Sequence, residues 1–144
     1  MKLREDSDGV ATSRFEVQTT GNEEIVDLTR RVEEAVAKAG ISDGIALVFT
    51  MHTTAGVAII EYEAGLLEDF RAFWRRVVPQ DIAYQHNRYD NNGHAHVRST
   101  LLGQSVTVPV SNGRLELGTW QSIVLCEFDP SPRTRNIVVK TIGE

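Results

Sequence analysis

Cysteine is nearly absent from this chain of 144 residues, which contains only Cys126. A single thiol cannot form an internal disulfide, and a domain of this length does not need one. Cys126 ends the apolar run Ile123–Cys126, which favours a small buried side chain. The sequence also lacks a second cysteine and a His-Glu-x-x-His motif, so it carries no standard short zinc signature.

Long hydrophobic runs are missing as well. No apolar stretch approaches the roughly 20 residues that a membrane-spanning helix needs. The start of the chain, Met1–Gly9, is charged where a secretion signal would be apolar. We therefore expect a cytoplasmic protein with no membrane partner.

The chain also has no excess of basic residues. The chain has 15 Lys and Arg against 20 Asp and Glu, and its formal net charge is -5. A negative protein repels nucleic acid unless its basic residues gather on one face, so we expect no nucleic-acid partner. With 41% hydrophobic and 24% charged residues, the composition is that of a globular protein.

Periodic patterns predict a mixed α+β fold. We expect a flexible N-terminal segment over residues 1–11 and a single domain over residues 12–144. Apolar alternation or continuous apolar runs predict strands at residues 12–19, 45–49, 57–60, 105–110, 114–117, 121–128 and 136–142, with a tight hairpin at Asn112–Gly113. About seven strands, the last four nearly consecutive, favour α+β over an alternating parallel fold.

Helical spacing predicts two main helices and a short one. The first would start at a capping box, Thr20–Glu23, and end at Gly40. The second would span residues 63–78, with Pro79 as its stop. A short helix is predicted over His94–Leu102, after a long polar loop.

All four histidines lie between residues 52 and 96, among polar residues and turn formers. Imidazole is a common metal ligand and titrates near neutral pH, so this clustering indicates a metal site or a proton-transfer site. His52 follows a predicted buried strand and precedes Thr53 and Thr54, which favours a functional role. The alternative is that His52 only donates a hydrogen bond to a loop carbonyl.

The other histidines are less constrained by the pattern. His86 and Asp90 lie in an irregular segment, so their spacing does not place them together. His94 and His96 would diverge by about 200 degrees on a helix, so one of them is expected to point into the site. If that helix starts near Gly93, its first-turn amides could bind phosphate, helped by Arg98 and Ser99.

Residue spacing alone leaves the presence of a metal open. Three imidazoles would form a plausible catalytic metal set with an open position for water or substrate. Two imidazoles with a carboxylate, such as Asp90 or Glu127, would serve equally.

Four sequence strings together resemble one known family. They are Met51–Gly56, Tyr84–Asn87, Ala95–Gly103 and Asn112–Gln121, and the end Val138–Glu144 is similar too. The chain resembles the YjbQ family, also called the secondary thiamine-phosphate synthase family, over nearly all of its length past residue 12. His94 stands where the family pattern has a small or acidic residue. Ile60 stands where the pattern commonly has Asn before the glutamate matched by Glu61.

The resemblance implies an α+β domain with a β-sandwich-like core and flanking helices, assembled as a homotrimer. It implies a pocket with three histidines near a subunit contact, matched by His52, His86 and His96, with His94 outside. The activity attached to the family joins hydroxymethylpyrimidine diphosphate to hydroxyethylthiazole phosphate and releases pyrophosphate.

The leading hypothesis is a metal-dependent enzyme acting on a small phosphorylated metabolite. A divalent cation, Zn or Mg, would be held by the three matched histidines and would neutralise the departing pyrophosphate. Glu127 and Arg98 are the predicted catalytic residues. The predicted substrate-binding residues are Thr53, Thr54, Glu61, Asn92 and Ser99. Two alternatives remain: a non-catalytic trimeric protein that binds a metal or a phosphometabolite, and purely structural histidines.

Overall fold

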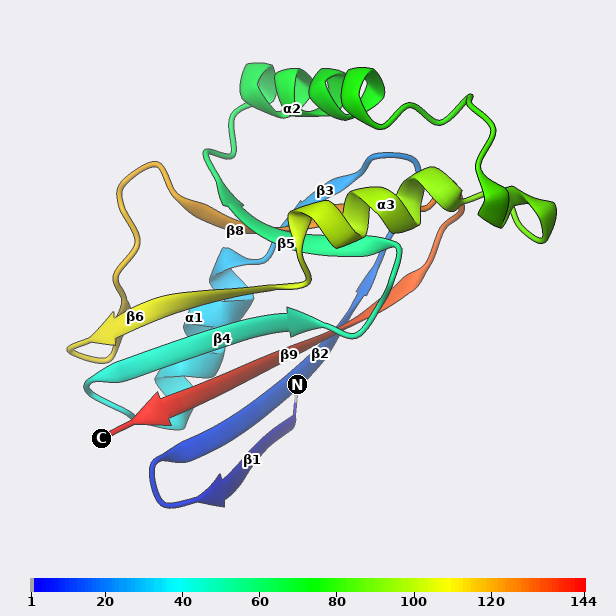
Figure 1. The fold of residues 1–144 in the computed structure, drawn as a ribbon. Helices are drawn as coiled ribbons and strands as arrows, with labels where there is room; N and C mark the ends of the chain where they lie inside the picture. Colours follow the sequence, from blue (N-terminus) through cyan, green and yellow to red (C-terminus); the bar gives the residue numbers. More distant parts are fainter. Residues whose placement is uncertain (1) are drawn as a thin grey trace.

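The structure is a computed structural model that describes residues 2–144, and it describes side chains from residue 8 onward. Its strands form two antiparallel sheets, one of six strands in the order β1-β2-β9-β4-β6-β7 and one of three in the order β3-β8-β5 (Figure 1). The strands are β1 (Lys2–Ser7), β2 (Val10–Gln18), β3 (Ile25–Asp27), β4 (Gly44–Thr50), β5 (Ala55–Ile60), β6 (Ser105–Ser111), β7 (Arg114–Leu115), β8 (Ser122–Glu127) and β9 (Thr134–Gly143). The helices are α1 (Thr29–Ala39), α2 (Ala64–Val77), the 3-10 helix η1 (Gln85–Arg88) and α3 (Gly93–Leu102). The predicted α+β class is confirmed.

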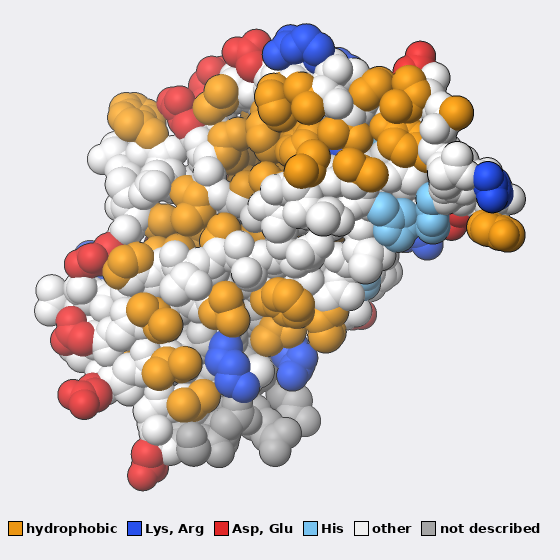
Figure 2. Space-filling view, viewed as in Figure 1, with side chains coloured by type: hydrophobic (Ala, Val, Ile, Leu, Met, Phe, Trp, Pro, Cys, Tyr) orange, Lys and Arg blue, Asp and Glu red, His pale blue; other side chains and the backbone are white. Residues whose placement is uncertain are grey.

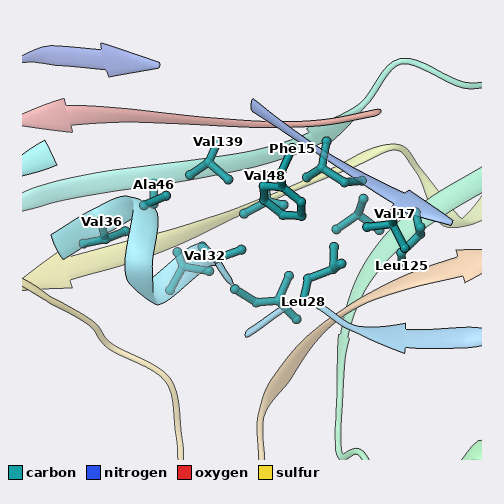
Figure 3. Packing of buried hydrophobic residues seen from close by; sticks show 14 of the residues in the cluster. Phe15, Val17, Leu28, Val32, Val36, Ala46, Val48, Leu125 and Val139 are labelled. Atoms are coloured by element: carbon teal, nitrogen blue, oxygen red, sulfur yellow. The ribbon is translucent and has the colours of Figure 1, made fainter. Parts of the chain in front are cut away.

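The elements form layers. The larger sheet and α1 enclose the main hydrophobic core against the smaller sheet, and α2 and α3 lie on the opposite side of the smaller sheet (Figure 1). In Figure 3, side chains of β2, β4, β9, α1 and β8 converge on this core. A second core, which includes Trp74 and Phe128, joins the smaller sheet to α2 and α3. No helix in the described part of the chain is long and apolar enough to cross a bilayer.

Strand β8 is buried on both of its faces. Ile123 and Leu125 belong to the main core, whereas Val124 and Cys126 belong to the second one. This explains why the strand is a continuous apolar run rather than an alternating one. The buried cysteine predicted from the sequence is confirmed, and burial raises the pKa of the Cys126 thiol to about 12.

The predicted capping box at Thr20–Glu23 is wrong. Asn22 and Glu23 have positive φ angles of 53° and 71°, which a helix cannot contain, and Ile25–Asp27 forms strand β3 along β8. Helix α1 begins only at Thr29, whose amide and hydroxyl both donate to Asp27 Oδ1, at 3.0 and 2.7 Å. The end of the helix at Gly40, with φ of 71°, is as predicted.

The N-terminal boundary also differs from the prediction. Residues 2–7 form β1, which pairs with β2, and β2 itself starts at Val10 rather than at residue 12. The polar composition of this segment concealed a strand at the edge of a sheet, where polar residues are common. The other predicted strands, α2, α3 and the Asn112–Gly113 hairpin are present.

Candidate functional site

A polar cleft of about 460 Å³ lies where the β4–β5 loop, the start of α3 and the start of β9 meet. We call it the histidine–arginine cleft, and it is lined by Met51, His52, Thr53, Thr54, Asn92, His96, Arg133, Thr134 and Arg135. Strand pairing explains its position, because Thr50 at the end of β4 lies opposite Ile137 near the start of β9. Two arginines and two histidines line the cleft, and no Asp or Glu is among these described lining residues.

The three histidines matched to the family lie at this cleft or beside it. His52 and His96 line it, and the His86 ring centroid lies 4.4 Å from that of His96. Helix η1 carries His86, and α3 carries His96. Figure 2 shows histidine side chains at the surface beside the segment where α3 and η1 meet in Figure 1.

Burial keeps the cleft histidines neutral. Desolvation lowers the pKa of His52, and the neighbouring Arg135 lowers it further. Desolvation likewise lowers the pKa of His96, followed by the effect of His86 beside it. At neutral pH both rings therefore offer one N–H group and one lone pair.

Arg135 supports the floor of the cleft through a buried ion pair. Its guanidinium donates twice to Glu127, once at 2.8 Å from Nε, and to the Thr54 hydroxyl at 2.7 Å. Glu127 accepts two further bonds, from the Thr19 hydroxyl at 2.6 Å and the Asp129 amide at 2.9 Å. All of these side chains are buried, so Glu127 does not line the cleft and acts on it through its partners, chiefly Arg135.

Asp129 organises the other side of the cleft. Its carboxylate accepts from Asn92 Nδ2 at 2.8 Å, from Arg133 Nε at 3.1 Å and from the Ser131 amide at 3.0 Å. Burial of Asp129 opposes its ionisation, but these three donors outweigh that effect and hold the carboxyl pKa below its usual value. The Oδ1 atom of Asn92 in turn lies 3.0 Å from His86 Nε2. One carboxylate thus positions an arginine of the cleft and, through an amide, a histidine beside it.

Several predicted site residues lie elsewhere. Arg98 is buried, donates to the Val78 carbonyl at 3.0 Å and pairs with Glu23 at 3.2 Å. The hydroxyl of Ser99 donates to the Ala55 carbonyl at 2.6 Å. Glu61 follows the far end of β5, and six strand residues at about 3.4 Å each separate it by roughly 20 Å from Thr54. The cleft is therefore built without these three.

A phosphate site was predicted at the start of α3, but three backbone amides there already donate hydrogen bonds to other groups of the protein. Gly93 N donates to Asn87 Oδ1 at 2.9 Å, and the amides of Ala95 and His96 donate to the Asn92 carbonyl. Arg98 and Ser99 also donate to other partners, so neither side chain is directed at the anion site predicted at this helix start.

The arrangement does not fit a metal centre with three histidine ligands. The backbone amide of Asn136 donates to His52 Nε2 at 2.9 Å, which uses the single lone pair of a neutral imidazole. Among the described residues, no group of three or more His, Cys, Asp or Glu is placed to hold a metal ion. The Zn or Mg prediction stays a prediction, which metal analysis of the purified protein tests.

Arg133, Arg135 and Asp129 are site residues that sequence reasoning did not single out. The available signal was the Asp129–Arg135 loop itself, which carries three charged side chains next to a buried strand. Such a loop could bind ligand or only solvent, and the sequence does not show that it meets His52 across the fold.

His94 lies outside the cleft, as predicted. It is buried beside Tyr84, at 6.5 Å between ring centroids, and its Nδ1 atom has no hydrogen-bond partner among the described residues. Desolvation, and then Arg98, lower the pKa of His94. The two histidines of α3 thus face different environments, as their helical spacing requires.

We expect the free energy of unfolding to fall as the pH is lowered through about 6.5. Below this pH the unfolded chain binds a proton at His94 that the folded chain, with its lowered pKa, does not yet bind, so acid favours unfolding. Urea unfolding at pH 7.5 and 5.5 measures the loss. His94→Gln should reduce the loss, whereas Thr100→Gln on the exposed face of α3 should leave it unchanged. An unchanged pH dependence in His94→Gln would contradict the assignment.

Comparison with known proteins identifies the family. The model of the family described as UPF0047 protein YjbQ-like matches residues 13–144. A UPF0047 protein of Archaeoglobus fulgidus is 48% identical over 126 residues, covering 88% of this chain and 97% of that protein. The UPF0047 protein YugU of Bacillus subtilis is 40% identical over 130 residues, covering 90% and 97%. The crystal structure of a YbjQ-like protein of unknown function from Sulfolobus solfataricus P2, 37% identical, superposes with a TM-score of 0.91 and covers 99% of this chain and 100% of that chain. The chain described above belongs to the YjbQ-like UPF0047 family.

Proposed function

We propose that this protein is an enzyme that acts on a phosphorylated small molecule in the histidine–arginine cleft. The observation that carries the proposal is the lining of the cleft, which combines two arginines, two histidines and threonine hydroxyls with no carboxylate among the described lining residues. The volume, about 460 Å³, suits a small metabolite. Such a surface favours an anion, although the whole chain is negative.

Arg133 is the proposed phosphate-binding residue. Its side chain is 47% exposed, and its Nε is bonded to Asp129, which fixes the plane of the guanidinium. The two terminal nitrogens are not used in that bond and can donate together to a phosphate. Thr53, which is exposed on the same cleft, is a proposed second donor.

The proposed reaction is the one that the resemblance implies, condensation of a pyrimidine diphosphate with a thiazole phosphate and release of pyrophosphate. Negative charge grows on the leaving oxygen, so cationic donors beside it lower the barrier. A bound phosphate next to His96 favours the charged imidazolium and raises its pKa, which lets His96 donate a proton to the leaving group. Arg135 and Glu127 act as positioning residues beneath this surface.

Inorganic pyrophosphate tests the binding step. Because a charge-assisted hydrogen bond contributes about 1.5–3 kcal/mol, Arg133→Ala should weaken pyrophosphate binding about 10-fold or more in isothermal titration. Arg30→Ala is the matched control, since Arg30 is 92% exposed on α1 and pairs with Glu34. Equal affinities in wild type and Arg133→Ala would refute the binding role of Arg133.

A turnover assay with the two phosphorylated substrates separates the enzyme from a binding protein. Formation of the joined product supports the proposed reaction. The family resemblance also left a non-catalytic phosphometabolite-binding protein as an alternative. Pyrophosphate binding without any product would favour that alternative.

We also propose that the protein assembles as a homotrimer. The outer face of the larger sheet carries exposed apolar side chains on adjacent strands, with Ile45 of β4 opposite Ile142 of β9, Phe49 further along β4 and Met51 just beyond its end. Exposed apolar side chains gathered on one face of a sheet suit a subunit contact. Met51 also lines the cleft. Sedimentation should give three times the chain mass of 16.0 kDa, and a mass of one chain would contradict the assembly.

A further inference from the structure

The hydrogen bonds of Asp129 fix the orientation of the Asn92 amide. Asp129 is 1% exposed, and as an ionised carboxylate it can only accept hydrogen bonds. Asn92 must therefore present its NH₂ group to Asp129 Oδ1, which lies at 2.8 Å. The opposite end of the amide, Oδ1, then faces His86 and is an acceptor.

The orientation of Asn92 determines where His86 carries its proton. His86 Nε2 lies 3.0 Å from Asn92 Oδ1, and a hydrogen bond to an acceptor requires a proton on Nε2. In the neutral ring, Nδ1 is then left with the lone pair.

His52 is subject to the opposite constraint. The backbone amide of Asn136 can only donate, and it donates to His52 Nε2 at 2.9 Å. Neutral His52 therefore has its lone pair on Nε2 and its proton on Nδ1.

We propose that the neutral rings of His52 and His86 are held in opposite tautomers, with the proton of His52 on Nδ1 and that of His86 on Nε2. Asp129 is the positioning residue that fixes the tautomer of His86 by orienting the Asn92 amide. Each ring keeps one nitrogen outside these bonds, an N–H donor on His52 and a lone pair on His86. The use of these two nitrogens, donation to a phosphate oxygen by His52 and acceptance of a hydrogen bond from neighbouring His96 by His86, rests on the proposed function. The tautomers themselves do not.

Long-range nitrogen–proton NMR spectra of uniformly ¹⁵N-labelled protein at pH 8 identify the protonated nitrogen of each neutral ring. The four histidines are few enough to assign with single His→Gln variants. We expect a protonated Nδ1 in His52 and a protonated Nε2 in His86. The same tautomer in both rings, or an unlocked mixture in His86, would overturn the proposal.

Asp129→Asn tests whether Asp129 is the cause. Two donors, the Ser131 amide and Arg133 Nε, meet Asp129 Oδ2, so the new amide should keep its oxygen there and turn its NH₂ toward Asn92. The Asn92 amide then has to rotate, which moves the proton of His86 from Nε2 to Nδ1 and leaves His52 unchanged.

Asp90→Asn is the matched control. Asp90 is exposed, and among the contacts described its carboxylate accepts a hydrogen bond only from the Asn91 amide. It should leave both tautomers unchanged. An unchanged His86 tautomer in folded Asp129→Asn would refute the role of Asp129, and the wild-type spectrum decides the tautomers if that variant does not fold. Correct tautomers without pyrophosphate binding would refute the proposed function and leave this inference standing.

Discussion

Replacing Arg135 with methionine is expected to lower the free energy of unfolding by about 3–5 kcal/mol, the cost of removing one partner from a buried ion pair. The exposed fractions of the Arg135 and Glu127 side chains are 3% and 0%. Without the guanidinium, the Glu127 carboxylate would remain buried with only the Thr19 hydroxyl and the Asp129 amide as donors. Guanidinium chloride unfolding, followed by tryptophan fluorescence at one protein concentration, measures the loss.

Two further variants show whether the loss comes from the unpaired charge. Arg30→Met removes an exposed partner of Glu34 and should cost at most about 0.5 kcal/mol. Adding Glu127→Gln to Arg135→Met removes the unpaired carboxylate and should recover part of the stability. The assignment fails if Arg135→Met is no more destabilising than Arg30→Met.

His96→Ala is expected to lower kcat for the proposed condensation by about 10²–10⁴-fold, the contribution of a positioned general acid. His96 is the histidine that both lines the cleft and contacts a second imidazole. Steady-state rates with the two phosphorylated substrates measure the effect. Val97→Ala alters the next residue on an exposed face of α3 and should leave kcat close to that of the wild type.

The binding of pyrophosphate distinguishes catalysis from recognition in this variant. If His96 acts as the acid, affinity should change much less than kcat, because Arg133 still holds the phosphate. A kcat within about twofold of the wild type would exclude His96 as the general acid.

Local sequence signals predicted β4, which ends just before His52, and α3, which carries His94 and His96, but not the 3-10 helix η1 of His86, which was expected to be an irregular loop. The apolar run before His52 became β4, and the pattern after Gly93 became α3, because both elements are fixed mainly by their own periodicity. Strand β3 was missed because it has three residues and is defined by its pairing with β8, while Ile25 and Leu28 also fit helical spacing. Asn22 is of a residue type that adopts positive φ angles readily, whereas Glu23 is not, so the residue types carry only half of the signal for this turn.

The contacts that organise the cleft could not be derived from local patterns. Arg135 is hydrogen-bonded to Thr54, which is 81 positions away in the sequence, and Asn92 is hydrogen-bonded to Asp129, which is 37 positions away. The family resemblance brought His52, His86 and His96 together, but the partners of Glu127 and Arg98 depend on which strands and helices are internal. For that reason two residues predicted to be catalytic prove to be buried ion-pair partners.

The position of Cys126 on the face of strand β8 that packs against α2 and α3 makes its thiol a chemical probe of the second core. A thiol with a pKa of about 12 and 1% exposure cannot meet a modifying reagent from either side of its sheet. The second core, between the smaller sheet and α2 and α3, must open before the sulfur becomes accessible, so the labelling rate of Cys126 reports the opening of this layer and is insensitive to fraying of surface loops.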